Sequence, residues 1–158
     1  MSTPGIWPVS STGRAAAPFV VIGLGLVIVG GFVSAAAAPT ASYHSSWAVA
    51  YVVLVAGVAQ GFIGLGQAVL TEGATSAKVR LAELCCWNAG NALVVAGTLL
   101  DVPIVLYLGC LPLIATLMLV LRALAHAPSN WLLWAMRVVV VILLVSMPTG
   151  IVLQAVSH

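Results

Sequence analysis

Apolar residues fill five long stretches of the chain, and short polar connections separate these stretches. They cover residues 15–38, 47–70, 79–100, 102–124 and 131–156. Each stretch is long enough for an α-helix to cross a hydrocarbon layer about 30 Å thick. Helices are expected because lipid offers no hydrogen-bond partner to a free backbone amide. The pattern therefore predicts an all-α, polytopic transmembrane helical bundle with five spans.

The composition supports lipid as the main solvent of the chain. Hydrophobic residues make up 63% of the 158 residues and charged residues 5%, whereas a soluble domain carries about 25% charged residues. Five basic and three acidic side chains are too few to cover a surface in water. The net charge is only +2, Lys78 is the one lysine, and the basic residues form no continuous stripe along the sequence. We therefore expect no nucleic-acid partner.

The basic residues predict the orientation of the spans. In a five-span arrangement all of them fall at the same side of the membrane, and they are Arg14, Lys78, Arg80, Arg122 and Arg137. Because Lys and Arg concentrate on the cytoplasmic side, residues 1–14 are expected to form a flexible cytoplasmic tail, and the C-terminus to lie outside. Arginine over lysine, with abundant Ala, Val, Gly and Leu, indicates a bacterial protein of the plasma membrane.

The first apolar stretch has a second interpretation. Arg14, the apolar run 19–32 and the small residues 34–37 also resemble a secretory signal with a cleavage site. Removal of this segment would leave four spans with the same orientation.

The third stretch carries a candidate intramembrane polar cluster. Arg80, Glu83, Trp87 and Asn91 share one helical face, with Asn88 beside it. A lone carboxylate inside a span costs several kcal/mol, so Glu83 is predicted to find a cation. That cation is either Arg80 on the same helix or Arg137, which enters the fifth span to a similar depth. The cluster is interpreted as a proton or ion relay or, preferably, as a structural ion pair with amides that join helices.

The second stretch carries a candidate helix-packing or pathway face. Gly57 and Gly61 form a GxxxG pair, which lets another helix approach closely. Gln60, Gly64 and Gln67 follow at a spacing that places them on one side of the helix. This face indicates either a polar pathway or an oligomer contact, or internal packing between spans, which is the favoured interpretation.

Two prolines predict kinks in the outer half of the membrane. Pro112 and Pro148 each remove a helical hydrogen bond. The kinks could open a cavity to the outside, lined by Asn91, Tyr107 and Gln154. The alternative is the ordinary tolerance of proline in membrane helices.

Metal, cofactor and thiol chemistry have weak support. The three cysteines lie in apolar runs without a CxxC spacing, and buried thiols are usually inert; they are Cys85, Cys86 and Cys110. His44, Asp101 and His158 are predicted on the outer side, but their separation gives no metal-ligand spacing. We therefore expect no metal and no cofactor. Asp101 is predicted to cap the helix that follows it, with Pro103 in the first turn.

Three functional hypotheses follow. The first is a non-enzymatic accessory, assembly or self-associating subunit, whose partners are the lipid bilayer and other membrane subunits or a second copy. The second is a small oligomeric transporter or channel that uses Glu83 and the outer-half cavity. The third, weaker, is an intramembrane enzyme or redox protein that uses Cys85 or Cys86.

Overall fold

The structure is a computed structural model that describes residues 10–40, 42–72 and 74–156, and among these the side chains up to residue 147. Its described residues are helical almost throughout and contain no strand. The helices are α1 (Ser11–Ala37), α2 (Tyr43–Tyr51), α3 (Gln60–Leu70), α4 (Ala77–Leu99), α5 (Pro103–Ala123) and α6 (Trp131–Val156). A π-helix, η2 (Val52–Ala59), joins α2 to α3, and the short 3₁₀ turns η1 (Ala38–Thr40) and η3 (Leu124–His126) follow α1 and α5.

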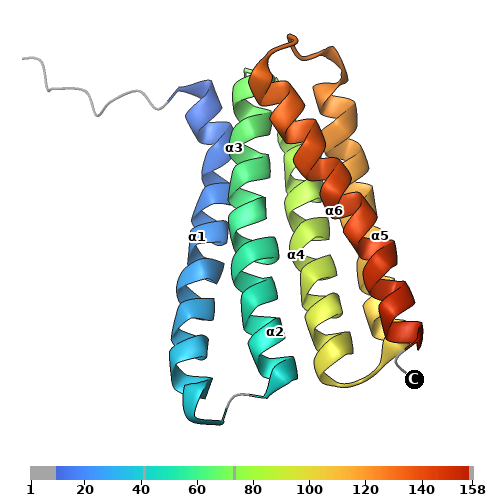
Figure 1. Ribbon diagram of the computed structural model, residues 1–158. Helices are drawn as coiled ribbons and strands as arrows, with labels where there is room; N and C mark the ends of the chain where they lie inside the picture. Colours follow the sequence, from blue (N-terminus) through green and yellow to red (C-terminus); the bar gives the residue numbers. More distant parts are fainter. Residues whose placement is uncertain (1–9, 41, 73, 157–158) are drawn as a thin grey trace, which may run out of the picture.

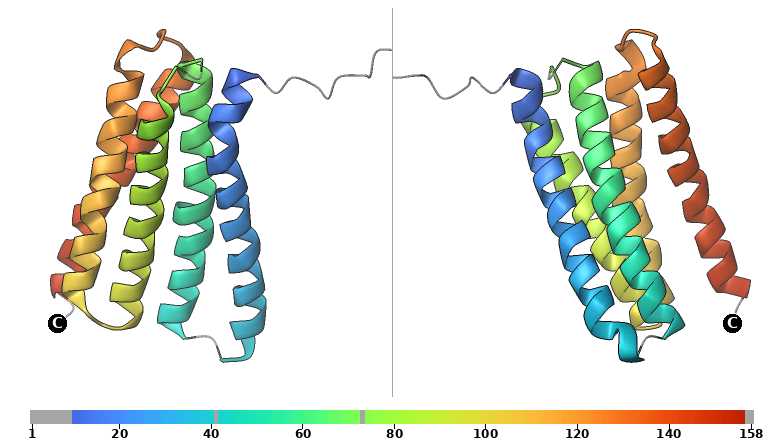
Figure 2. Two further views of the ribbon diagram at one scale, coloured as in Figure 1. Left: turned by 180° about the vertical axis from the view of Figure 1, so that it is seen from behind. Right: turned by 60° about the vertical axis from the view of Figure 1, so that its left-hand side comes forward.

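The helices form five rods that run up and down side by side (Figure 1, Figure 2). The rod α2–η2–α3 packs along α1, and α5 packs along α4. Helix α6 lies against α3 and α5. The main core lies among α3, α4, α5 and α6, so the bundle consists of two helical hairpins joined by a fifth helix.

The rods agree with the five predicted apolar stretches. Within the described residues, three segments are long and apolar enough to cross a membrane, namely Ser11–Thr40, Tyr43–Leu70 and Pro103–His126. The described side chains of α6 add a shorter apolar run, Trp131–Met147. Helix α4, which carries Lys78, Arg80 and Glu83, is not among the three. The fold is therefore an all-helical bundle whose apolar helices suit a membrane.

Side-chain caps fix most helix starts. Ser10 accepts a hydrogen bond from the Gly13 amide at 3.0 Å, so α1 begins four residues before the predicted stretch and includes the end of the predicted tail. Ser42 forms a capping box with Ser45 at the start of α2. The Asn130 side chain accepts from the Leu133 amide at 2.8 Å at the start of α6. Residues 1–9 of the predicted tail lie outside the described residues.

The turn between α4 and α5 corrects one prediction. Asp101 does not cap α5; Val102 precedes its first turn, and no side chain caps this helix. Asp101 instead adopts φ 54°, a left-handed conformation that Asp tolerates better than most residues. Pro103 occupies the first turn of α5 as predicted. Asp101 therefore reverses the chain, and the missing proline donor reduces the need for a cap.

Glycines allow the closest approaches between helices. A Cβ atom on Gly23 of α1 would lie 2.7 Å from the Gly57 carbonyl oxygen of η2. A Cβ atom on Gly109 of α5 would lie 2.8 Å from the Gly90 carbonyl oxygen of α4. Both hairpins thus depend on backbone contacts that larger residues would exclude.

Candidate functional site

One face of α4 carries the polar residues that the sequence analysis singled out. Glu83, Trp87 and Asn91 follow one another at intervals of four residues, and all three are buried. These three side chains therefore lie on the buried side of α4. Arg80, one turn earlier, is only partly buried. Glu83 lies about 9 Å along the axis from the start of α4 at 1.5 Å per residue.

Glu83 links three helices. Its Oε1 atom accepts a hydrogen bond from Nε2 of Gln67 on α3 at 3.1 Å. Its backbone oxygen lies 3.4 Å from the Thr116 hydroxyl of α5, which also donates to the Pro112 carbonyl oxygen at 2.9 Å. The Oε2 atom is buried and has no hydrogen-bond partner among the described residues. Oε1 therefore has a hydrogen-bond donor, whereas Oε2 has none among the described residues.

Arg80 and Arg137, the two predicted cations for Glu83, lie in different surroundings. The Arg80 guanidinium donates to the Thr75 carbonyl oxygen in the α3–α4 connection. The Arg137 guanidinium carbon lies 5.6 Å from the centre of the Trp134 ring on its own helix, a cation–π arrangement. Arg80 carries a positive charge that acts on Glu83 from one turn away on the same helix. The structure therefore brings the Gln67 amide of α3 to Glu83, in addition to the charge of Arg80 on the same helix.

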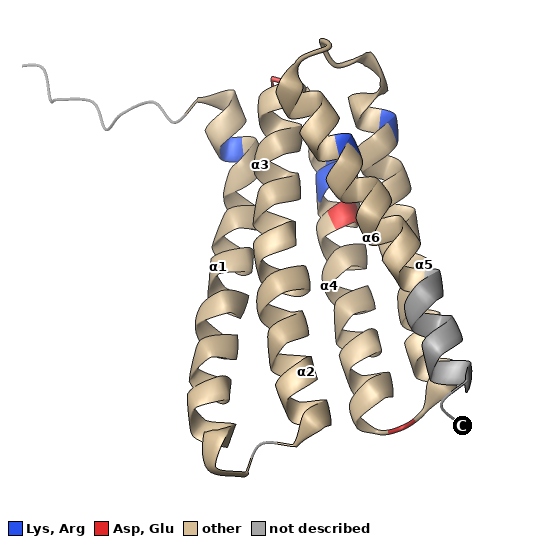
Figure 3. Ribbon diagram, in the orientation of Figure 1, with Lys and Arg blue, Asp and Glu red and all other residues tan. Residues whose placement is uncertain are grey.

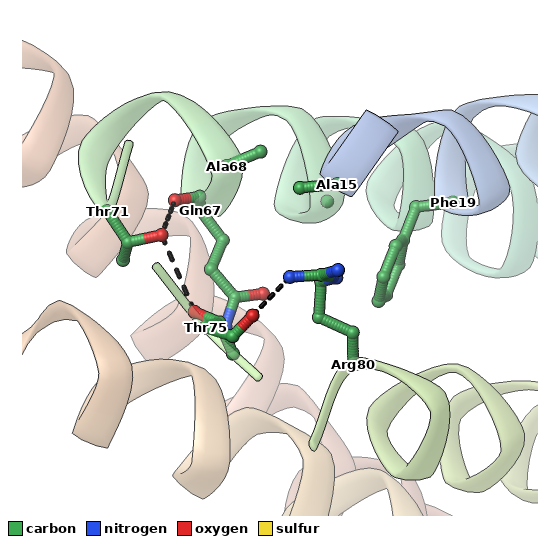
Figure 4. Close-up of a pocket in the computed structure, with 8 residues that line it drawn as sticks. Ala15, Phe19, Gln67, Ala68, Thr71, Thr75 and Arg80 are labelled. Atoms are coloured by element: carbon green, nitrogen blue, oxygen red, sulfur yellow. Dashed lines mark hydrogen bonds between the residues drawn. The ribbon is translucent and has the colours of Figure 1, made fainter. Parts of the chain in front are cut away.

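A narrow crevice lies beside Gln67, between α1, α3 and the start of α4 (Figure 4). It is lined by Ala15, Phe19, Gln67 and Arg80 among others and has no room for a water molecule. The Thr71 hydroxyl donates to the Gln67 carbonyl oxygen at 2.8 Å. The crevice is therefore a tightly packed helix–helix contact rather than an open binding pocket.

The two asparagines of α4 bond within their own helix. Asn88 donates to the Leu84 carbonyl oxygen and Asn91 to the Trp87 carbonyl oxygen, both at 2.8 Å. Asn88 is partly buried, whereas Asn91 is buried and its Oδ1 atom lacks a partner among the described residues. No hydrogen bond joins either side chain to Glu83 in this part of the chain.

The residues of the candidate face on α2–η2–α3 contact two different helices, α1 and α4. Gln60 donates to the Phe19 carbonyl oxygen of α1 at 3.3 Å, and Gly64 lies directly against the Phe19 side chain. Gly57 makes the close contact with α1, whereas a Cβ atom on Gly61 would meet nothing within 4 Å. Gln67 faces α4 instead. Gln60, Gly64 and Gly57 thus serve internal packing, in line with the favoured interpretation.

The π-helix was not foreseen from the sequence. The Trp87 indole donates to the Ala56 carbonyl oxygen in η2 at 3.4 Å, and this ring is buried. The wider turn of a π-helix leaves carbonyl groups less regularly paired, and such segments often occur at functional positions. Trp87 therefore joins α4 to the second rod one turn below Glu83.

A groove between α1 and α2 was also missed. It has a volume of about 550 Å³, and its lining residues are small or apolar; they include Gly30, Gly31, Ser34, Ala38, Val49 and Val53. Gly30 contacts Val53 at the floor, but a Cβ atom on Gly31 would meet nothing within 4 Å. The repeated spacing of Gly30, Ser34 and Ala38 is a small-xxx-small pattern and was the available signal.

The remaining predicted residues lie apart from these features. Cys85 is exposed, Cys86 is partly buried and Cys110 is buried, and the described residues contain no disulfide and no cluster of metal-binding side chains. Pro112 lies inside α5, and Tyr107 is partly buried. The side chains of Pro148 and Gln154, on which the predicted outer cavity depends, lie outside those described, as does His158.

Comparison of the chain with models of protein families, with curated proteins and with solved structures finds no match.

Proposed function

We propose that this protein is a multi-pass protein of the plasma membrane that works without catalysis, as an accessory, assembly or self-associating subunit. Its partners in this proposal are the lipid bilayer and a transmembrane helix of another subunit or of a second copy. The open Gly31 in the α1–α2 groove is the observation that carries the proposal.

The proposed topology has five spans, with the N-terminus in the cytoplasm and the C-terminus outside. The basic residues gather in the half of the bundle that holds the α3–α4 and α5–α6 connections (Figure 3). Asp101 lies in the α4–α5 connection, at the other end. This separation of charge supports the orientation because cytoplasmic ends carry the excess of Lys and Arg.

The hydrogen bonds of the buried polar side chains support a role for these residues in helix packing rather than in chemistry. Among the described residues, Gln67 and Glu83, Gln60 and Phe19, and Trp87 and Ala56 form hydrogen bonds between helices of the same chain. Such interhelical bonds contribute about 0.6 to 2 kcal/mol each in membranes. These polar groups hold the bundle together, and the crevice beside Gln67 admits no water.

The outer surface supports association through the groove. Helices in lipid associate where small residues let their backbones come close. The chain already uses this device internally, where Gly23 meets Gly57. The groove offers a comparable set of small residues, with Gly31 and Ser34 both exposed. A partner helix in this groove would pack its backbone closely against α1, and its van der Waals contacts there would be more extensive than those of lipid chains.

A matched pair of variants tests this proposal. A Cβ atom at either Gly31 or Gly25 would meet nothing within 4 Å, so leucine at either position leaves the fold intact, but only Gly31 lines the groove. Gly31→Leu should weaken association about tenfold, the equivalent of one interhelical contact. Gly25→Leu should leave it unchanged. Native mass spectrometry in mild detergent would measure the fraction of chain in complexes and separate a second copy from another subunit.

Equal behaviour of the two variants, or a wild-type chain that is monomeric and without partner, would contradict the proposal.

The transporter hypothesis remains the alternative, favoured by the buried Glu83 carboxylate. It predicts that Glu83→Gln abolishes ion flux in proteoliposomes while the helical content stays the same. The accessory role predicts that the wild-type chain gives no flux above that of empty vesicles.

A further inference from the structure

The outward face of α4 carries a regular pattern that the other described helices leave largely uncovered. Six residues follow one another at alternating intervals of four and three positions and lie within about 80° of arc at 100° per residue. They form the α4 seam, which consists of Leu81, Cys85, Asn88, Ala92, Val95 and Leu99. Asn88 and Val95 are partly buried, and the other four are exposed. The buried residues of α4, among them Trp87 and Val94, lie outside this arc.

An alternation of four and three residues is the spacing of a coiled-coil seam. It repeats every seven residues, which keeps a narrow stripe turned toward a partner as two helices supercoil around each other. Two small members of the seam, Cys85 and Ala92, lie on either side of Asn88 and let a second backbone come close. Contact with lipid chains requires apolar side chains but no such regular spacing. The α4 seam therefore has the form of a contact surface for another helix.

Asn88 lies in the middle of the seam and of the helix. It is 11 positions after Ala77 and 11 before Leu99, so it is about 16 Å from either end at 1.5 Å per residue. Its amide nitrogen donates to the Leu84 carbonyl oxygen of its own helix at 2.8 Å, and within the described residues no donor reaches its Oδ1 atom. In the five-span topology this amide is partly exposed near the centre of the bilayer, where a polar group without a partner is costly.

We propose that the α4 seam is a dimer interface between two parallel copies of this chain, in which the two Asn88 side chains form hydrogen bonds with each other. Copies inserted with the same topology present α4 in the same direction and at the same depth. A twofold axis along the membrane normal then places each seam residue opposite its own counterpart. An asparagine amide has both a donor and an acceptor, so it can satisfy a second asparagine.

The inference rests on the self-association and membrane location proposed above. It names the partner as a second copy and assigns an interface apart from the α1–α2 groove. A single asparagine in a seam of this kind also fixes the register and the number of helices that associate. Asn88 is therefore expected to select the aligned dimer over shifted arrangements.

The native cysteines supply a matched pair of probes for this interface. Cys85 belongs to the seam, whereas Cys86 follows it by 100° around the helix and lies outside the seam. The variant Cys86→Ala, Cys110→Ala keeps Cys85 alone, and Cys85→Ala, Cys110→Ala keeps Cys86 alone. Each would be diluted into lipid vesicles and oxidised with copper phenanthroline. Because a disulfide requires Cα atoms within about 7 Å, we expect a covalent dimer through Cys85 and about tenfold less through Cys86.

Replacement of the seam asparagine is the second measurement. Asn88→Leu, in the variant that keeps Cys85, should raise the dissociation constant of the dimer about 3- to 30-fold, the equivalent of one interhelical hydrogen bond. Helical content should stay the same, because the described hydrogen bond of this side chain lies within α4. Equal crosslinking through Cys85 and Cys86, or an Asn88→Leu dimer as tight as its parent, would overturn the proposal.

Gly31→Leu separates this interface from the groove. Crosslinking through Cys85 should be unchanged by this substitution, and its loss would contradict a separate interface on α4. Absence of Cys85 crosslinking, with Gly31-dependent complexes intact, would overturn the α4 dimer and leave the accessory role standing. A wild-type chain that is monomeric and without partner would overturn both.

Discussion

Replacing Gly97 with leucine should destabilise the bundle by about 3 kcal/mol, the upper end of the usual cost of overpacking. A Cβ atom at this position would lie 2.8 Å from the Leu106 Cα atom and closer still to its backbone nitrogen. Backbone atoms cannot rotate away, so α4 and α5 must separate near their shared turn. Unfolding in mixed detergent micelles, followed by circular dichroism, would measure the loss.

Gly25→Leu is the control for this experiment, because its new side chain would point into open space. We expect its free energy of unfolding to stay within about 0.5 kcal/mol of the wild type, as for most surface changes. A Gly97 variant as stable as the Gly25 variant would show that the α4–α5 contact is looser than the structure has it.

Trp87→Ala should also cost about 3 kcal/mol, at the lower end of the range for truncating a buried tryptophan. The ring has a relative exposure of 1% and packs in the main core. Its removal leaves a cavity and takes the indole donor from the Ala56 carbonyl oxygen. Lipid weakens the hydrophobic contribution, but the lost packing contacts remain.

Trp131→Ala is the matched control, because Trp131 is 80% exposed at the start of α6. The same unfolding measurement should give a change within about 0.5 kcal/mol. Equal losses in the two tryptophan variants would argue against Trp87 as the joint between α4 and η2.

The helices could be predicted because lipid imposes a strict demand on sequence. A span needs about 20 apolar residues, and the backbone has no alternative to helix in hydrocarbon. The first residues of the helices were harder to predict from the sequence. Ser10 begins α1 earlier than the apolar stretch does, and Ser42 caps α2 well before the second apolar stretch begins. Several serines and an aspartate near these ends were equally plausible caps.

The candidate site shows where the sequence stops being informative. Helical periodicity alone placed Glu83, Trp87 and Asn91 on a common buried face. The partner of Glu83 depended on which rods are neighbours, and the pattern gave no reason to choose Gln67 over Arg137. The π-helix has no distinct residue signature, because it depends on a shifted hydrogen-bond register rather than on composition.

The most direct test of the account is the location of the two chain ends. Five spans place them on opposite sides of the membrane, with the basic connections in the cytoplasm. Compartment-sensitive reporters fused before Met1 and after His158 would measure this in whole cells. We predict a cytoplasmic signal from the first and an external signal from the second; signals from the same compartment would require an even number of spans and would contradict the account.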